Sequence, residues 1–170
     1  MRLHAAVRSA NGLLPFGHVG WGYPNRDESF SRAAEYIADG LRHNQCITYA
    51  REGTHAALRS ELAAMPGIGE HLDSGGIVVM PLEVFYIFGP GSGIVDAQRM
   101  LAKYLAAAAQ AITKGYTGLR VIVDVTPVAR TSEQRDALAR LEHHLGAYCW
   151  RVSCADLDSR SSLGTGMART

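Results

Sequence analysis

Two patterns of apolar residues alternate along this chain: short runs rich in β-branched side chains, and longer stretches with apolar residues three and four positions apart. The longer stretches predict helices. The short runs are bounded by turn-forming residues and predict strands, at residues 17–23, 46–50, 76–80, 119–124 and 148–154. Such alternation is typical of a parallel sheet covered by helices on both faces. We therefore expect a three-layer α/β sandwich with a five-stranded, mainly parallel sheet, whose strand order the pattern leaves open.

Capping residues and helix breakers give bounds to the predicted helices. The signals are Asn25 or Asp27 for the first helix, Thr54 for a short second one, Gly115 closing a long helix at 96–114, and Thr131 with Gln134 for the last, which Gly146 closes. Residues 82–93 are the least regular part of the chain. Residues 84–88 are compatible with a strand, but the glycine-rich run at 89–93 would end it abruptly. We favour a turn or flexible lid there over a phosphate-binding loop, because no lysine accompanies the run.

Length and composition limit the class of protein. The 170 residues allow one domain with a sizeable core, and we expect a leader at 1–15, an α/β domain at 16–158 and a tail or linker at 159–170. The chain is 47% hydrophobic and carries a formal net charge of +1, with Lys and Arg scattered. We therefore expect no direct nucleic-acid binding, no membrane span and a cytoplasmic location. The three cysteines, without CxxC spacing, are expected to be reduced thiols.

The segment from His18 to Glu28 occupies the position of a phosphate-binding loop. It has glycines, but it lacks the lysine and the Ser or Thr that hold phosphates and Mg²⁺ in such loops. Trp21, Tyr23 and Arg26 stand there instead. This bulky, aromatic composition favours a pocket for a small organic molecule over a nucleotide site.

Ligands of open parallel sheets bind at the carboxyl ends of the strands. The residues expected to bind a ligand there are His18, Trp21, Tyr23, Arg26, Phe85, Tyr86, Asp124 and Thr126. The competing interpretation is that the aromatic members are ordinary core. Asp124 is expected to cap a loop or to accept a hydrogen bond from the ligand, and Arg120 to form a structural ion pair with Glu142. We expect no catalytic residue, no metal and no cofactor; His143 and His144 lack the spacing of a metal-binding helix and are expected at the surface.

Several short motifs occur in the order typical of one sensory family. The most specific is Gly-Tyr-Thr-Gly-Leu-Arg-Val at residues 115–121, followed by Asp124; the others are His18, Tyr23, Asp27 with Glu28, Gly40 with Leu41, Glu142, and Cys154 with Asp156. On these residues the chain resembles the MEDS (methanogen/methylotroph regulator) sensory domain family. The sequence departs from the family where Gly20 and Gly22 flank Trp21, and at Ala155-Asp156.

The resemblance implies a RecA/KaiC-like or Rossmann-like fold without a P-loop, a small hydrocarbon-type organic ligand, and a protein output partner or fused regulator domain. We therefore expect a non-catalytic sensory domain that regulates transcription through that partner or domain. The sequence does not decide whether the domain forms a homodimer. One alternative is a ligand-independent interaction module in a sigma-factor, anti-sigma or kinase pathway. A second is a degenerate nucleotide-binding enzyme.

Overall fold

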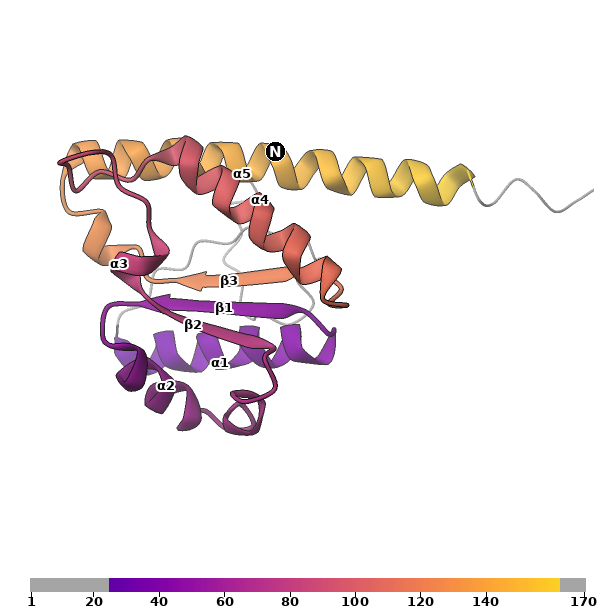
Figure 1. Ribbon diagram of the computed structural model, residues 1–170, viewed down its shortest axis with the longest axis horizontal. Helices are drawn as coiled ribbons and strands as arrows, with labels where there is room; N and C mark the ends of the chain where they lie inside the picture. The colour runs from indigo at the N-terminus through magenta and orange to yellow at the C-terminus, as the bar shows by residue number, and fades with distance from the viewer. Residues whose placement is uncertain (1–24, 163–170) are drawn as a thin grey trace, which may run out of the picture.

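The computed structural model describes the backbone of residues 25–162 and the side chains of residues 25–147 (Figure 1). The predicted strand at 17–23 and the leader at 1–15 lie outside the described residues. The elements are α1 (Arg26–Arg42), β1 (Cys46–Arg51), α2 (His55–Ala63), η1 (Gly69–His71), β2 (Ile77–Pro81), α3 (Leu82–Phe85), α4 (Ala97–Thr113), β3 (Leu119–Val123), η2 (Thr126–Val128) and α5 (Ser132–Ser162). No helix within the described residues has the length and hydropathy needed to cross a membrane.

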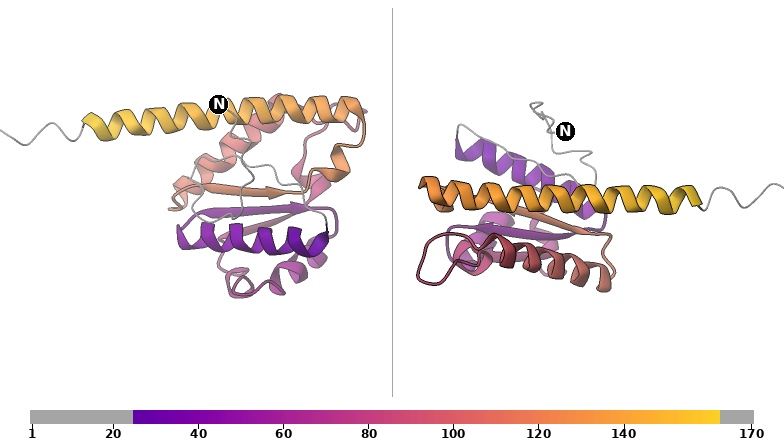
Figure 2. Two further views of the ribbon diagram at one scale, coloured as in Figure 1. Left: turned by 180° about the vertical axis from the view of Figure 1, so that it is seen from behind. Right: turned by 90° about the horizontal axis from the view of Figure 1, so that it is seen from above.

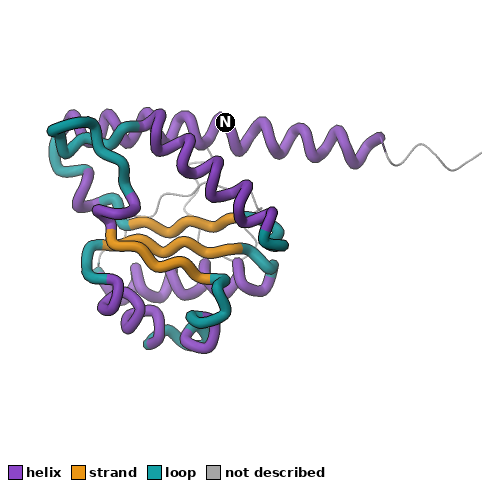
Figure 3. Tube along the Cα trace, viewed as in Figure 1, coloured by secondary structure: helices purple, strands orange, loops and turns teal. Residues whose placement is uncertain are grey.

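The described part of the sheet has three parallel strands in the order β2-β1-β3 (Figure 3). The strands predicted at 46–50, 76–80 and 119–124 are confirmed, as is the parallel α/β class. The strand predicted at 148–154 is wrong, because these residues continue α5. A short apolar run does not distinguish a strand from a buried or continued helix, and an interior glycine such as Gly146 weakens a helix by only about 1 kcal/mol. Residues 84–88 contribute the end of α3 and one antiparallel bridge, between Phe88 and Val95.

Helices cover both faces of the sheet and make three layers (Figures 1 and 2). Alternate residues of β1 point to opposite faces: Ile47 and Tyr49 pack with α1 and α2, whereas Ala50 packs with α3, α4 and α5. All of β1 from Cys46 to Ala50 is buried, as expected for a central strand, while β3 is only half-buried at most positions. Beyond α4, the second half of α5 extends away from the sheet (Figure 2).

The predicted first residues of the helices are confirmed by their capping side chains, but the prediction that Gly146 closes the last helix is wrong, because α5 continues through it. The side chain of Asn25 accepts a hydrogen bond from Glu28 N at 2.9 Å, and Thr54 accepts one from Ala57 N at 3.2 Å. Thr131 and Gln134 form the reciprocal capping box at the start of α5. After α4, Gly115 has φ 89°, a left-handed conformation that glycine adopts without strain.

A buried ion pair joins α1 to β3 at the end of the sheet where the strands begin. Arg120 Nη2 donates to Asp39 Oδ2 at 2.6 Å, and the two side chains are 5% and 4% exposed. Arg120 also donates to the Gln45 side chain and to the Tyr36 carbonyl, and its guanidinium lies 4.5 Å from the Tyr36 ring centroid. The predicted pairing of Arg120 with Glu142 is therefore wrong. Arg120 points to the α1 face of the sheet, whereas Glu142 belongs to α5 on the opposite face.

This ion pair lies at the meeting point of two motifs that carry the family resemblance. Gly40 packs so closely that an added Cβ would lie 2.5 Å from Ile47 Cδ1 and 2.7 Å from Arg120 Cδ. Gly118 immediately precedes β3, and its carbonyl oxygen accepts a hydrogen bond from Cys46 N at 2.9 Å. The 115–121 motif thus builds the junction of α1, β1 and β3, at the end of the sheet opposite its carboxyl edge.

Candidate functional site

Charged side chains gather at the carboxyl edge of the sheet, where β1 and β3 end. Arg51 Nη1 contacts Glu61 Oε1 at 2.9 Å, and Arg51 Nη2 lies 3.5 Å from Asp124 Oδ2. Tyr49 donates its hydroxyl hydrogen to Glu61 Oε1 at 2.6 Å. Arg26, in the first turn of α1, reaches Glu61 Oε2 at 3.2 Å. We call these five residues the carboxyl-edge cluster.

The cluster balances its own charge. Arg26 and Arg51 supply two positive charges, and Glu61 and Asp124 supply two negative ones. The side chains of Arg51 and Glu61 are each 14% exposed, whereas that of Arg26 is 76% exposed. The pair between Arg51 and Glu61 is therefore partly shielded from water, while Arg26 contributes a weak, screened interaction.

Two groups of the cluster, Tyr49 and Arg51, have raised pKa values. Burial, and then the hydrogen bond to Glu61, raise the pKa of the Tyr49 hydroxyl far above its ordinary value, so Tyr49 remains a donor. Burial disfavours the charge on Arg51, but the adjacent Tyr49 and Glu61 outweigh it and raise the pKa of the guanidinium. Tyr49, Arg51 and Glu61 thus form a mutually hydrogen-bonded set within the cluster.

Asp124 links the cluster to the segment that leads into α5. Its Oδ1 accepts a hydrogen bond from Thr126 N at 3.0 Å, at the start of the 3-10 turn η2. This confirms that Asp124 caps a neighbouring loop. The Thr126 side chain is exposed beside it.

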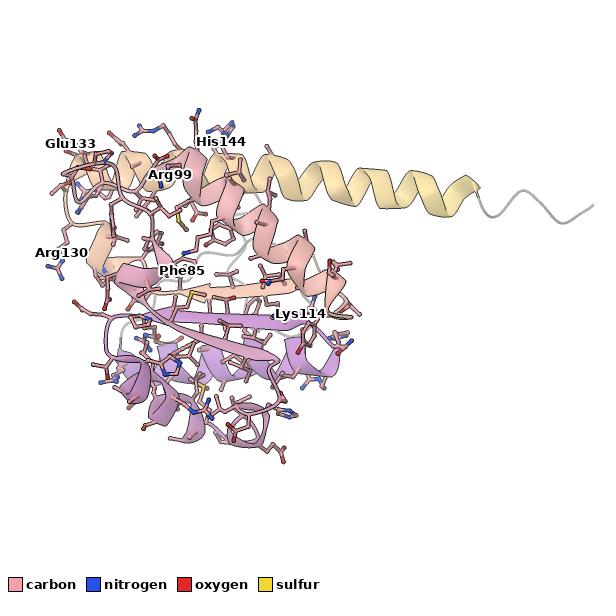
Figure 4. The ribbon with its side chains drawn as sticks, viewed as in Figure 1. Phe85, Arg99, Lys114, Arg130, Glu133 and His144 are labelled. Carbon is pink, nitrogen blue, oxygen red and sulfur yellow. The ribbon has the colours of Figure 1, made fainter. Side chains whose placement is uncertain are left out.

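Phe85 and Tyr86 lie inside the core shared by α3, α4 and α5, and Figure 4 shows Phe85 between the sheet and the layer of α4 and α5. Each is only 4% exposed. The Phe85 ring packs edge-to-face against Tyr86 and Tyr104, with centroids 5.0 and 5.8 Å away. Burial, and then the charges of Glu142 and Asp124, raise the pKa of the Tyr86 hydroxyl. Lys103 holds this region together by donating to the carbonyls of Val84 and Phe85.

The structure thus brings some of the predicted site residues together. Arg26, Asp124 and Thr126 belong to one continuous set of contacts around Arg51 and Glu61. Phe85 and Tyr86 instead lie in the core on the α4 side, as the competing interpretation expects. His18, Trp21 and Tyr23 lie outside the described residues, although only Pro24 separates Tyr23 from the cap of α1.

The predicted site residues leave out three members of the cluster, Tyr49, Arg51 and Glu61. The spacing of Tyr49 and Arg51 places both on the same face of a strand, which is a usable signal. No comparable signal exists for Glu61, because its contact with Arg51 depends on how α2 packs on β1. His143 and His144 are exposed, as expected, and His144 points away from the sheet (Figure 4).

Two open surface hollows of about 480 Å³ are lined by no residue of the carboxyl-edge cluster. One is lined by α2, η1 and Asp73; the other runs along α1 from Asp27 to Arg42 and is bordered by Pro66. Neither includes a residue of β1 or β3. Within the described residues, no group of three or more His, Cys, Asp or Glu side chains could hold a metal ion.

Comparison with family models shows what kind of domain this is. The model described as "MEDS: MEthanogen/methylotroph, DcmR Sensory domain" matches residues 17–154, which is most of the chain. No curated protein and no solved structure is significantly similar. The match confirms the resemblance drawn from the motifs, and the chain belongs to the MEDS sensory domain family.

Proposed function

We propose that this domain is a non-catalytic sensor that binds a small, neutral organic molecule at the carboxyl edge of its sheet. The observation that carries the proposal is the match to a sensory-domain family over residues 17–154. Of the predicted site residues, Trp21, Tyr23, Arg26, Asp124 and Thr126 would contact the ligand. Phe85 and Tyr86 would support the site from below.

The charge of the edge supports a neutral ligand. A nucleotide site needs an uncommitted cation for the phosphates, whereas the guanidinium of Arg51 is engaged by Glu61, Tyr49 and Asp124. Releasing it would remove the guanidinium from two partly buried carboxylates, Glu61 and Asp124, which is costly. A neutral molecule demands no such rearrangement. The same reasoning weighs against the degenerate nucleotide-binding enzyme.

A chain of contacts leads from the edge to α5 and suggests how binding is transmitted. Asp124 holds η2 through Thr126 N, and Val128 of η2 packs in the core with Leu138 and Leu141 of α5. A ligand that shifts Asp124 would therefore bias the start of the helix that extends from the sheet. In this proposal α5 carries the signal to a regulatory partner or a fused output domain controlling transcription.

Thermal-shift and calorimetric screening of small neutral organic molecules tests the proposal, with ATP as the anionic comparison. A ligand present at about 100 times its Kd should stabilise the folded chain by about 2.7 kcal/mol. Trp21→Ala should abolish the shift, while Trp150→Ala, at the only other tryptophan, should retain it. Stabilisation by ATP alone, or equal loss of ligand binding in both variants, would contradict the proposal.

A ligand-independent interaction module is the second candidate. It is favoured by the extension of α5 beyond the sheet (Figure 2) and by the saturated contacts of the carboxyl-edge cluster. The discriminating measurement is whether a purified output partner binds with the same affinity in the presence and absence of any ligand that the screen finds. Equal affinities favour this candidate over the sensor.

A further inference from the structure

Arg51 lies between two carboxylates that different elements of the fold supply. Its Nη1 donates to Glu61 Oε1 of α2 at 2.9 Å, whereas its Nη2 lies 3.5 Å from Asp124 Oδ2, just after β3. The first contact is a charge-assisted hydrogen bond, and the second is longer than a normal hydrogen bond. Both hydrogen bonds that Arg51 donates to described side chains leave from Nη1, one to Glu61 and one to Tyr49. The two carboxylates therefore share the guanidinium unequally, and Glu61 holds it more closely.

The other oxygen of Asp124 holds the segment that leads into α5. Asp124 Oδ1 accepts a hydrogen bond from Thr126 N at 3.0 Å, at the start of η2. Val128 of η2 belongs to the same core cluster as Leu138 and Leu141 of α5. Arginine binds a carboxylate most strongly through two parallel hydrogen bonds, one to each oxygen. An arginine that engaged Asp124 in that way would compete with the Thr126 amide for Oδ1.

Arg51 has two positions that leave none of the charges around it without a partner. If the guanidinium moved away, Glu61 would keep the hydrogen bond from the Tyr49 hydroxyl at 2.6 Å and the contact with Arg26 at 3.2 Å. Arg51 would lie beside a carboxylate in either position, so its partly buried charge keeps a counter-ion throughout. A conformational switch requires two such arrangements, separated by a small free energy.

We propose that Arg51 is a two-position switch and that Glu61 is the positioning residue that sets it. With Arg51 on Glu61, as in this structure, Asp124 holds η2 through the Thr126 amide. With Arg51 on Asp124, that hydrogen bond weakens and the start of α5 is less constrained. A ligand that donates a hydrogen bond to Glu61 would loosen its hold on Arg51 and move the switch. This use in sensing rests on the proposed function, whereas the switch itself is tested on the ligand-free chain.

Amide hydrogen exchange of the full chain, read residue by residue by NMR, tests the switch. Glu61→Gln removes the charge that holds Arg51, so the Thr126 amide should exchange roughly 3- to 10-fold faster, as expected for the loss of one hydrogen bond. The Ala57 amide, which Thr54 holds in the same helix as Glu61, should change by less than about twofold. A general loosening of α2 would speed exchange of the Ala57 amide at least as much as that of Thr126, and would overturn the proposal. An unchanged Thr126 amide would overturn it too.

Arg51→Met distinguishes a switch from a simple support. If Arg51 only supported Asp124, this variant would speed exchange of the Thr126 amide as Glu61→Gln does, and that result would overturn the proposal. If Arg51 is the competing cation, the amide should exchange as slowly as in the wild type, and adding Glu61→Gln should have no further effect. An effect of Glu61→Gln that persists without Arg51 would also overturn it.

Glu52→Gln is the matched charge control, because Glu52 is adjacent to Arg51 in sequence but exposed. It should leave the Thr126 amide unchanged, and faster exchange there would show a general effect of net charge instead of a switch. These rates do not depend on whether a ligand is found. A screen that finds none would contradict the sensor while leaving the switch intact, and the exchange results above would contradict the switch alone.

Discussion

Replacing Asp39 by Asn tests whether the buried pair with Arg120 holds α1 against the sheet. The substitution keeps the shape of the side chain and removes its charge. Arg120, with a side chain 5% exposed, would keep its bonds to Gln45 and the Tyr36 carbonyl but lose its counter-ion. Removing one partner of a buried pair costs about 3–5 kcal/mol. Because an Asn oxygen can still accept from Arg120, we expect the lower value, about 3 kcal/mol.

The assay is urea and thermal unfolding followed by circular dichroism. For a chain of this length, 1 kcal/mol corresponds to roughly 2–4 °C in Tm, so the variant should melt roughly 6–12 °C below the wild type. Glu35→Gln is the matched control, since the side chains of Glu35 and its partner Arg32 are each about one-third exposed. It should cost no more than about 0.5 kcal/mol.

A double-mutant cycle and the pH dependence give the pair a specific signature. Arg120→Met should cost less in the Asp39→Asn background than in the wild type, because the charge it removes is already unpaired. Burial alone would raise the pKa of Asp39, but the bond and charge of Arg120, together with the bond from Arg42 and the charge of His43, outweigh it and lower that pKa. The pair's contribution is therefore complete above the ordinary value of 3.8 and is lost as the pH falls through the lowered folded value. The difference in the free energy of unfolding between the wild type and Asp39→Asn should therefore decrease as the pH is lowered into the acid range.

Three results would refute this reasoning. A cost below about 1 kcal/mol for Asp39→Asn would show that the pair contributes little to holding α1 against the sheet. An equal cost for Glu35→Gln would show that burial does not matter. Additive costs in the cycle would show that Asp39 and Arg120 act independently.

Three further substitutions test other parts of the structure by the same unfolding measurements. Gly40→Ala should destabilise by about 1–3 kcal/mol, because its Cβ would collide with Ile47 and Arg120; a neutral result would contradict the close packing. Glu61→Gln should cost about 1–2 kcal/mol by leaving Arg51 less well paired, whereas Glu52→Gln, at an exposed position, should change little. Gly146→Ala should stabilise by about 0.5–1 kcal/mol, because the added methyl meets no atom within 4 Å inside a continuous α5; destabilisation would indicate that the helix ends there.

Local signals gave the most reliable predictions for this chain. The cap residues Asn25, Thr54 and Thr131 act on backbone groups three residues away, so their effect is contained within a few positions of sequence. Gly115 adopts the left-handed conformation expected at a helix end. The prediction at 148–154 failed for the converse reason: its apolar residues suit either a strand or a helix, and local signals do not decide between them.

The sequence by itself determined the alternation of strands and helices, the helix caps and the family, because each depends on residues close together in the chain. Tertiary structure alone decided that Arg120 pairs with Asp39, 81 positions away, and that Glu61 of α2 completes the cluster with Tyr49 and Arg51. It also decided the strand order β2-β1-β3. These contacts arise only when separate elements pack together, since burying a charge selects whichever opposite charge the packing brings within reach.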